Sequence, residues 1–212
     1  VGLPFNMEGR LMFYRKDIFE AEGLKVPATE KQWLDAVKYF HNNLAKMRQK
    51  YGSDFYGATY MYGAEQGPAY PFSTYWGKFD WKKHKTDNGF WDENYQNIVD
   101  EKLLAQSFKF WQDAKQYMPP GVETFNLPEA YQFFVDGKTA MTEVWPLTLY
   151  GMLLDPRHEE IRKKTGVADI AYGMPFSGGW AICMVSTSKH KDAAWAYLKL
   201  MTSAEADFQF FR

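Results

Sequence analysis

The side chains of this sequence that are best suited to bind a ligand are its many aromatic rings and two isolated carboxylates. Phe, Trp and Tyr together make up 18% of the 212 residues, and the C–H faces of sugar rings stack on such side chains. A richly packed core is the competing explanation for the same composition. The carboxylates of Glu65 and Glu143 could in principle form the acid and nucleophile pair of a glycoside hydrolase. Neither lies in a motif that this chemistry requires, so we expect binding without catalysis.

Composition argues against several other kinds of site. The single cysteine, Cys183, excludes an intramolecular disulfide framework and a multi-cysteine zinc cluster. A net charge of −1 lacks the basic surface that nucleic-acid binders carry. No apolar run approaches membrane-spanning length. The 4 histidines show no metal-ligand spacing, so we expect neither a metal nor a cofactor: they are His41, His84, His158 and His190.

The strongest local pattern precedes Trp145. Asn126 and Glu129 predict a capping box at the start of an amphipathic helix. Beyond this helix, alternating residue types predict a strand that brings Glu143 and Trp145 close to an edge. We expect the segment to be a scaffold that presents the Trp145 ring to a site.

Helices alternate with single strands along the rest of the chain, which predicts an α/β fold. Apolar residues at helical spacing predict long helices at 29–50 and 97–117, with Phe108 on the core-facing stripe of the second. Residues 78–94 are expected to form a surface excursion. The other strand candidates are residues 10–14, 55–62, 167–172 and 181–186.

Motifs in matching order resemble the extracellular solute-binding proteins of ABC transporters, the sugar-binding group that includes maltose-binding protein. They are GLPF at 2–5, YRKDIFEAEGLKVPAT at 14–29, FVDGKTAM at 134–141 and GMPFSGGWAICMVSTSKHKDAAWAYLKLM from Gly173. The resemblance implies a type II periplasmic-binding-protein-like lobe, in which helices surround a small mixed sheet and segments cross a hinge.

The same resemblance implies a division of the chain. Residues 1–6 would cross the hinge, and residues 7–172 would form the second lobe. Residues 173–212 would return across the hinge and begin the part that packs on the first lobe. Since the chain starts at Val1 without methionine and stops inside an apparent helix, we expect a fragment of a longer protein.

The resemblance also suggests ligand contacts. Trp145 and Trp180 are the expected aromatic plates, and Gly178 and Gly179 would let backbone amides approach a ligand. Packing or a solvated loop is the competing explanation for each candidate. The remaining candidate ligand residues are Glu65, Gln66, Tyr75, Trp76 and Glu143.

The function implied is the substrate-binding component of an ABC importer, which closes around a sugar, oligosaccharide or polyol and delivers it to a membrane permease. We expect a monomer when full length, outside the cytoplasm, either periplasmic or extracellular and membrane-anchored, with no nucleic-acid partner. A carbohydrate-active enzyme and a structural module are the alternatives. Glu8 and Arg10, beside the first crossing, are expected to be an ion pair or solvated charges.

Overall fold

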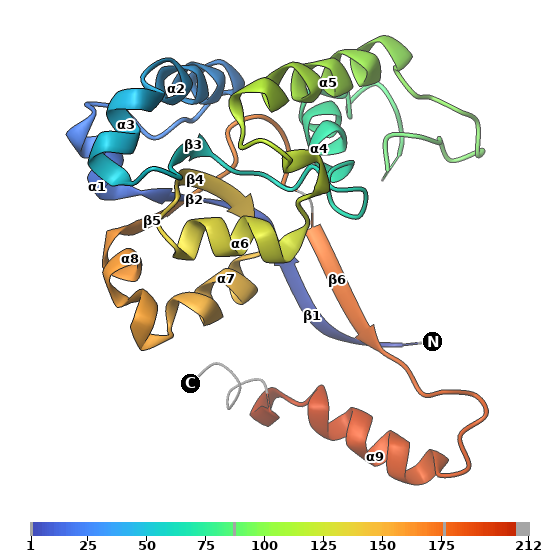
Figure 1. Ribbon diagram of the computed structural model, residues 1–212. Coiled ribbons are helices and arrows are strands. Elements are labelled where there is room, and N and C mark those ends of the chain that lie inside the picture. Colours follow the sequence, from blue (N-terminus) through green and yellow to red (C-terminus); the bar gives the residue numbers. More distant parts are fainter. Residues whose placement is uncertain (1, 87, 176, 207–212) are drawn as a thin grey trace. The chain divides into compact units, whose positions relative to one another are not determined.

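The computed structural model describes residues 2–86, 88–175 and 177–206, and the chain divides into two compact units (Figure 1). Unit 1 comprises Val1–Gly9 with Ser177–Arg212, and unit 2 comprises Arg10–Phe176. The last residues of the segment expected at 173–212 lie outside the described residues.

Unit 2 is built on a mixed sheet of four strands in the order β3-β4-β2-β5. β4 runs parallel to β3 and antiparallel to β2, and β5 runs antiparallel to β2. The expected strands at 55–62 and 167–172 are shorter or shifted in the structure. The strands are β2 (Leu11–Arg15), β3 (Tyr56–Ala58), β4 (Thr139–Val144) and β5 (Thr165–Ala168).

All 6 residues of β4 are buried. Strands pair with it on both edges, and helices α2 (Glu30–Asn42) and α6 (Leu127–Val135) lie on opposite faces of the sheet (Figure 1). A strand covered on both faces has no solvent side. The strand expected before Trp145 is confirmed, but its alternating residue types do not mark a solvent face, and Glu143 is buried within it.

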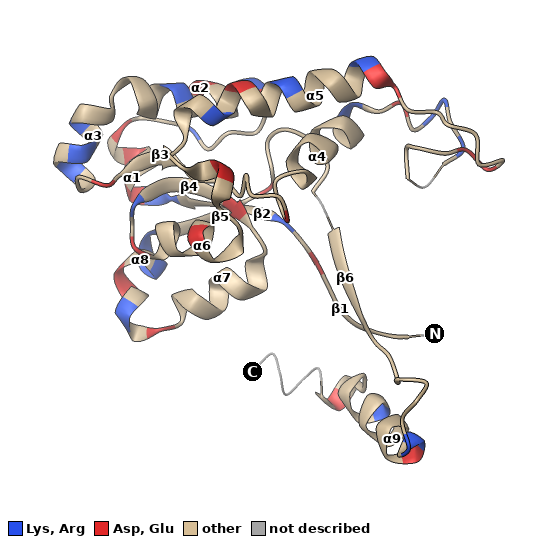
Figure 2. Cartoon of the chain, turned by 45° about the vertical axis from the view of Figure 1, so that its right-hand side comes forward, with Lys and Arg blue, Asp and Glu red and all other residues tan. Residues whose placement is uncertain are grey.

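Helices surround this sheet and, with the single strands between them, confirm the α/β class. The sheet lies between α2 and α3 on one side and α6 and α7 on the other (Figure 1). Basic residues mark α3, and both acidic and basic residues mark α8, whereas α7, which begins directly after Trp145, carries no charge (Figure 2). The remaining helices of unit 2 are α1 (Lys16–Ala21), α3 (Leu44–Tyr51), α4 (Ala69–Lys78), α5 (Glu101–Ala114), α7 (Pro146–Leu153), α8 (Glu159–Lys164) and the 3-10 turns η1 (Lys115–Tyr117), η2 (Val122–Thr124) and η3 (Pro156–His158).

The long helix expected at 29–50 is two helices that meet at Asn43. Thr29 caps the first one, because its side chain accepts a hydrogen bond from the Gln32 backbone amide. At Asn43 the backbone leaves helical geometry, with φ −107° and ψ 19°. Its side-chain amide donates to the Tyr39 carbonyl at 2.8 Å, and such side-chain bonds compete with the helical ladder.

Much of the aromatic content packs in the core of unit 2. The Trp33 ring lies 5.4 Å from Tyr60 and 5.0 Å from Trp111, and its indole N–H donates to the Tyr60 hydroxyl at 2.7 Å. Trp111 and Tyr172 meet edge to face at 4.7 Å. The expectation for Phe108 is wrong, since 43% of this residue is exposed.

The surface excursion runs between α4 and α5 and is held by two rings of α4. The Tyr75 hydroxyl donates to the Gly89 carbonyl at 2.8 Å, and the Trp76 indole donates to the Asn88 carbonyl at 2.9 Å. Both carbonyls belong to the excursion, so α4 anchors it from one side.

Unit 1 contains the antiparallel pair β1 (Leu3–Gly9) and β6 (Ser177–Ile182), followed by α9 (Lys191–Met201). The strand expected at 181–186 begins earlier than its residue types indicate, because pairing with β1 fixes its position. Within the described residues, no helix is long and apolar enough to cross a bilayer.

Candidate functional site

A buried arginine stands directly before β2. Arg10 has no exposed surface, and its guanidinium carbon lies 4.8 Å from the Tyr70 ring centre and 5.1 Å from that of Trp145. A guanidinium N–H donates to the side-chain carbonyl of Gln66. Removed from water, a cation gains more from ring faces than it does at an exposed site. We name Arg10, Gln66, Tyr70, Glu143 and Trp145 the Arg10 cluster.

The sheet brings the two ends of this cluster together. Leu11 of β2 faces Val144 of β4 in the antiparallel ladder. Arg10 precedes the first of these residues and Trp145 follows the second, so both emerge at the same end of two paired strands. Trp145 is half-buried and stands before the first residue of α7.

Helix α4 is attached to the same end of the sheet through Tyr70. The Tyr70 hydroxyl donates to the backbone carbonyl of Glu143 at 3.0 Å and accepts from the Met61 amide at 3.3 Å. These bonds fix the ring on which the Arg10 cation rests. Because the Tyr70 hydroxyl makes its hydrogen bonds within the protein, Tyr70 contributes only its ring to the Arg10 cluster.

A tight turn before α4 sets the orientation of Gln66. The amides of Gln66 and Gly67 both donate to the Gly63 carbonyl, at 3.2 and 2.8 Å. The turn directs the half-buried Gln66 to Arg10 and leaves Glu65 exposed. With its carbonyl oxygen held by Arg10, the Gln66 side chain has its NH₂ group as the donor for another molecule.

Glu143 is the buried carboxyl of the Arg10 cluster. The residue has no exposed area, and neither carboxyl oxygen has a hydrogen-bond partner among the described residues. Burial raises the pKa of Glu143 to about 8, although the nearby Arg10 charge acts in the opposite direction. The carboxyl is therefore mainly protonated at neutral pH.

The other candidates from unit 2 fall elsewhere. Tyr75 is fully buried and Trp76 half-buried, and both contact the surface excursion through the bonds described above. The hydrogen bonds described for these two residues lead to the excursion and to Asp100. In the part of the chain that is described, no three His, Cys, Asp or Glu side chains gather closely enough to hold a metal ion.

The candidates from the second crossing lie in unit 1. Gly178, Gly179 and Trp180 belong to β6, and 68% of Trp180 is exposed. A Cβ built at Gly179 would meet nothing closer than the Asn6 carbonyl oxygen at 3.9 Å. Packing within the described residues therefore does not require glycine at this position.

Sequence reasoning missed Arg10 and Tyr70. Of the two expectations for Arg10, an ion pair or a solvated charge, the solvated charge is wrong, because the residue is fully buried. Its position directly before an apolar strand could have indicated that Arg10 is buried. Because a charged residue is seldom fully buried without partners, the same position also indicates that partners lie close to it. Nothing in the aromatic run around Tyr70 distinguishes this ring from its neighbours.

Comparison with known proteins identifies the family. The model of the family described as Bacterial extracellular solute-binding protein matches residues 1–207. The Probable amino-acid ABC transporter periplasmic-binding protein y4oP of Sinorhizobium fredii is 24% identical over 220 residues, covering 97% of this chain and 44% of that protein. The Mannitol-binding protein of Pseudomonas aeruginosa is 24% identical over 213 residues, covering 95% and 44%.

Among solved structures, the maltose-bound MalE3 of T. maritima superposes with a TM-score of 0.76 at 22% identity, covering 97% of this chain and 51% of that one. The chain thus spans about half the length of the relatives it matches. The fold is that of a type II periplasmic-binding-protein lobe, as the sequence motifs implied. The chain belongs to the bacterial extracellular solute-binding protein family.

Proposed function

We propose that this chain supplies the second lobe, with both hinge crossings, of the substrate-binding component of an ABC importer. The receptor holds a sugar, oligosaccharide or polyol between two lobes and delivers it to a membrane permease. The observation that carries the proposal is the half-buried Trp145 ring, held in place by the buried Arg10. Two relatives support a carbohydrate ligand: one is named a mannitol-binding protein, and the other was solved with maltose bound.

In this proposal Trp145 receives the C–H face of the ligand. Its ring is fixed before binding, so little conformational freedom is lost when a ligand stacks on it. The NH₂ group of Gln66 donates to a ligand hydroxyl, and the exposed carboxylate of Glu65 accepts from another. Glu143 is fully buried, so it acts indirectly, as a mainly protonated carboxyl near Arg10.

Unit 1 offers its own candidate ligand contacts. Trp180 supplies an exposed ring, and the space over Gly179 lets a ligand approach the backbone. Ligand contacts made by both lobes of a receptor favour its closed state and so make hinge closure depend on the ligand. Tyr75 and Trp76 contribute by holding the surface excursion on α4.

The whole receptor acts outside the cytoplasm, as its family does, and works as a monomer with a permease as its protein partner. It binds without chemical turnover. Amino acids are the competing ligand class, because the name of the Sinorhizobium fredii relative specifies one.

A thermal-shift screen of the full-length receptor tests the proposal. A ligand that binds only the folded state raises the melting temperature by mass action. We expect a shift with one class of sugar or polyol, lost in Trp145→Ala and in Trp180→Ala. The control is Trp91→Ala, which removes a ring that is 51% exposed in the surface excursion and should leave the shift unchanged.

Two results would contradict the proposal. Shifts with amino acids alone would remove the carbohydrate assignment and leave the receptor assignment standing. Release of product from labelled oligosaccharides would favour the carbohydrate-active enzyme instead.

A further inference from the structure

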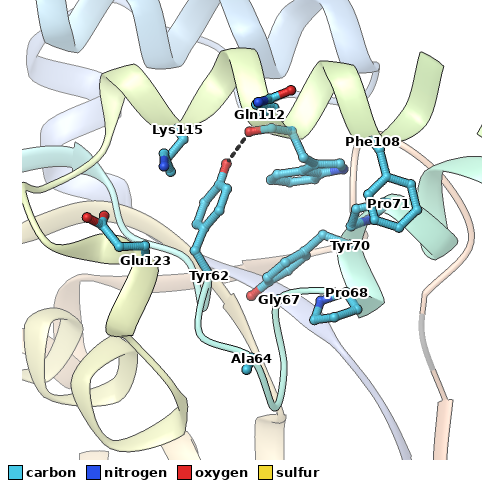
Figure 3. Close-up of a pocket in the computed structure, with 11 residues that line it drawn as sticks. Tyr62, Ala64, Gly67, Pro68, Tyr70, Pro71, Phe108, Gln112, Lys115 and Glu123 are labelled. Carbon is cyan, nitrogen blue, oxygen red and sulfur yellow. Dashed lines mark hydrogen bonds between the residues drawn. The ribbon is translucent and has the colours of Figure 1, made fainter. Parts of the chain in front are cut away.

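Unit 2 contains a cavity of about 310 Å³ beside the turn that precedes α4 (Figure 3). The turn, α4, α5 and η2 surround it. Its volume equals roughly ten water molecules and lies at the lower end of the range of small-molecule sites. One hexose ring with its hydroxyls fits into a space of this size. We name it the α5 cavity; its principal walls are Tyr62, Tyr70, Phe108 and Trp111.

The polar atoms of three of these rings are bonded to the protein. The Tyr62 hydroxyl donates to the Trp111 carbonyl at 3.0 Å, drawn as the dashed line in Figure 3. The Trp111 indole donates to the Thr74 hydroxyl at 2.9 Å, and the Tyr70 hydroxyl donates to the Glu143 carbonyl. The rings are therefore held in fixed orientations. Tyr70 and Trp111 are almost fully buried behind the wall, and Tyr62 is half-buried and offers carbon surface to the cavity.

Phe108 is the unusual wall. Its spacing in the sequence places it on the core stripe of α5, but 43% of the residue is exposed. The ring meets Phe72 edge to face at 5.7 Å, which fixes its orientation. An occupant of the cavity would cover apolar surface that water now contacts.

The rim of the cavity is polar and carries both signs of charge. Gln112, Lys115 and Glu123 are exposed, and Lys115 and Glu123 reach the cavity from the side of Tyr62 (Figure 3). Amide, ammonium and carboxylate groups together donate to and accept from hydroxyls. Opposite charges at one rim favour a neutral ligand, because either sign of ligand charge would meet a like charge.

We infer that the α5 cavity binds a neutral sugar ring, with its carbon surface against Tyr62 and Phe108 and its hydroxyls at the rim. This inference rests on the proposed function. Tyr70 contacts Arg10 and also lines the cavity, so the cavity adjoins the Arg10 cluster. The ring is either the next unit of an oligosaccharide held at Trp145 or a separate monosaccharide.

Titration calorimetry of the full-length receptor distinguishes these sources. If one oligosaccharide spans Trp145 and the α5 cavity, lengthening it by one sugar ring raises the affinity about tenfold, which is the effect of one ring stack. If the sugars are separate, a monosaccharide titrates with two molecules per protein. Ala64→Phe fills the cavity without removing a contact group, and Lys115→Ala alters only the rim. In each variant, the affinity should no longer rise with the length of the oligosaccharide, or the second monosaccharide should no longer bind.

The control is Lys109→Ala, on the exposed face of α5, where Lys109 pairs with Asp113. Thermal unfolding of each variant without ligand shows that the fold is kept. Sugar binding with neither a length dependence nor a second event, unchanged in both variants, would overturn this inference and leave the proposed function standing. Absence of binding by any carbohydrate would overturn both.

Discussion

The guanidinium of Arg10 rests on the ring of Trp145, with 5.1 Å between the guanidinium carbon and the ring centre. The two residues adjoin Leu11 and Val144, which face each other in the central ladder of the sheet. The position of the aromatic plate is thus tied to the most buried part of unit 2. Substitutions in this part of the fold should therefore change the affinity for the ligand.

Arg10→Lys should weaken ligand binding more than it weakens the fold. Lysine keeps the charge but lacks the planar fork that rests on two rings and donates to Gln66. We expect a loss of about tenfold in affinity by calorimetry, as for the loss of one desolvated cation–π contact and one charged hydrogen bond. Arg157→Lys changes an arginine that is exposed and should have no effect. Equal affinities in the two variants would contradict a positioning role for Arg10.

Glu143→Gln should change the pH dependence of stability. Burial raises the pKa of Glu143 from its ordinary 4.5 to about 8, so between these values the folded state binds a proton that the unfolded state releases. The free energy of unfolding should then fall as pH rises from 4.5 to 8, by up to about 1.4 kcal/mol per pH unit. Glutamine cannot ionise, so denaturant unfolding of the variant should lose this slope.

The matched control for that measurement is Glu93→Gln, which replaces an exposed carboxylate in the surface excursion. Its stability should follow the unaltered protein across the same pH range. Parallel curves for Glu143→Gln and the unaltered protein would show that Glu143 is ionised in the folded state.

Gly57→Ala should destabilise unit 2 strongly. A Cβ at Gly57 of β3 would overlap the side chain of Phe40, which is fully buried in α2. Overpacking of this kind costs about 1–3 kcal/mol. At Gly151, inside α7, a Cβ would meet nothing within 4 Å, so Gly151→Ala should stabilise by about 0.5–1 kcal/mol through helix propensity. Thermal melts of the two variants with opposite shifts would confirm this packing.

Tyr75→Phe should loosen the surface excursion. It removes the hydroxyl that donates to the Gly89 carbonyl and accepts from the Asp100 amide. Limited proteolysis should cut residues 79–99 several-fold faster, since local opening requires one buried anchor fewer. Tyr95→Phe alters a tyrosine that is 87% exposed and serves as control. Equal cleavage rates in the two variants would show that the ring, without its hydroxyl, holds the segment.

Local features of this fold could be predicted from the sequence. The Glu129 carboxylate accepts from the Asn126 backbone amide at 2.9 Å, as the expected capping box requires, because both residues lie within four consecutive positions. The position of β6 could not be predicted, because its pairing partner β1 lies about 170 residues earlier and outweighs local residue types.

The candidate site was only partly predictable for a similar reason. The sequence predicts Trp145 and Gln66 as candidate ligand residues, and in the structure both contact Arg10. The burial of Glu143 depends on strands and helices that cover β4 from every side, which an alternating pattern in one strand does not reveal. The position of Arg10 between two rings depends on residues 60 and 135 positions away in the chain.

The place of β4 in the sheet also sets the order of events during synthesis. β2 and β3 are made early, but they are not neighbours, and β4 is the strand that joins them. Until residue 144 has left the ribosome, both strands keep open edges that can pair with other chains. A nascent chain of this protein therefore exposes unpaired edges of β2 and β3 until β4 is made, and this part of the sheet closes only when β4 inserts between them.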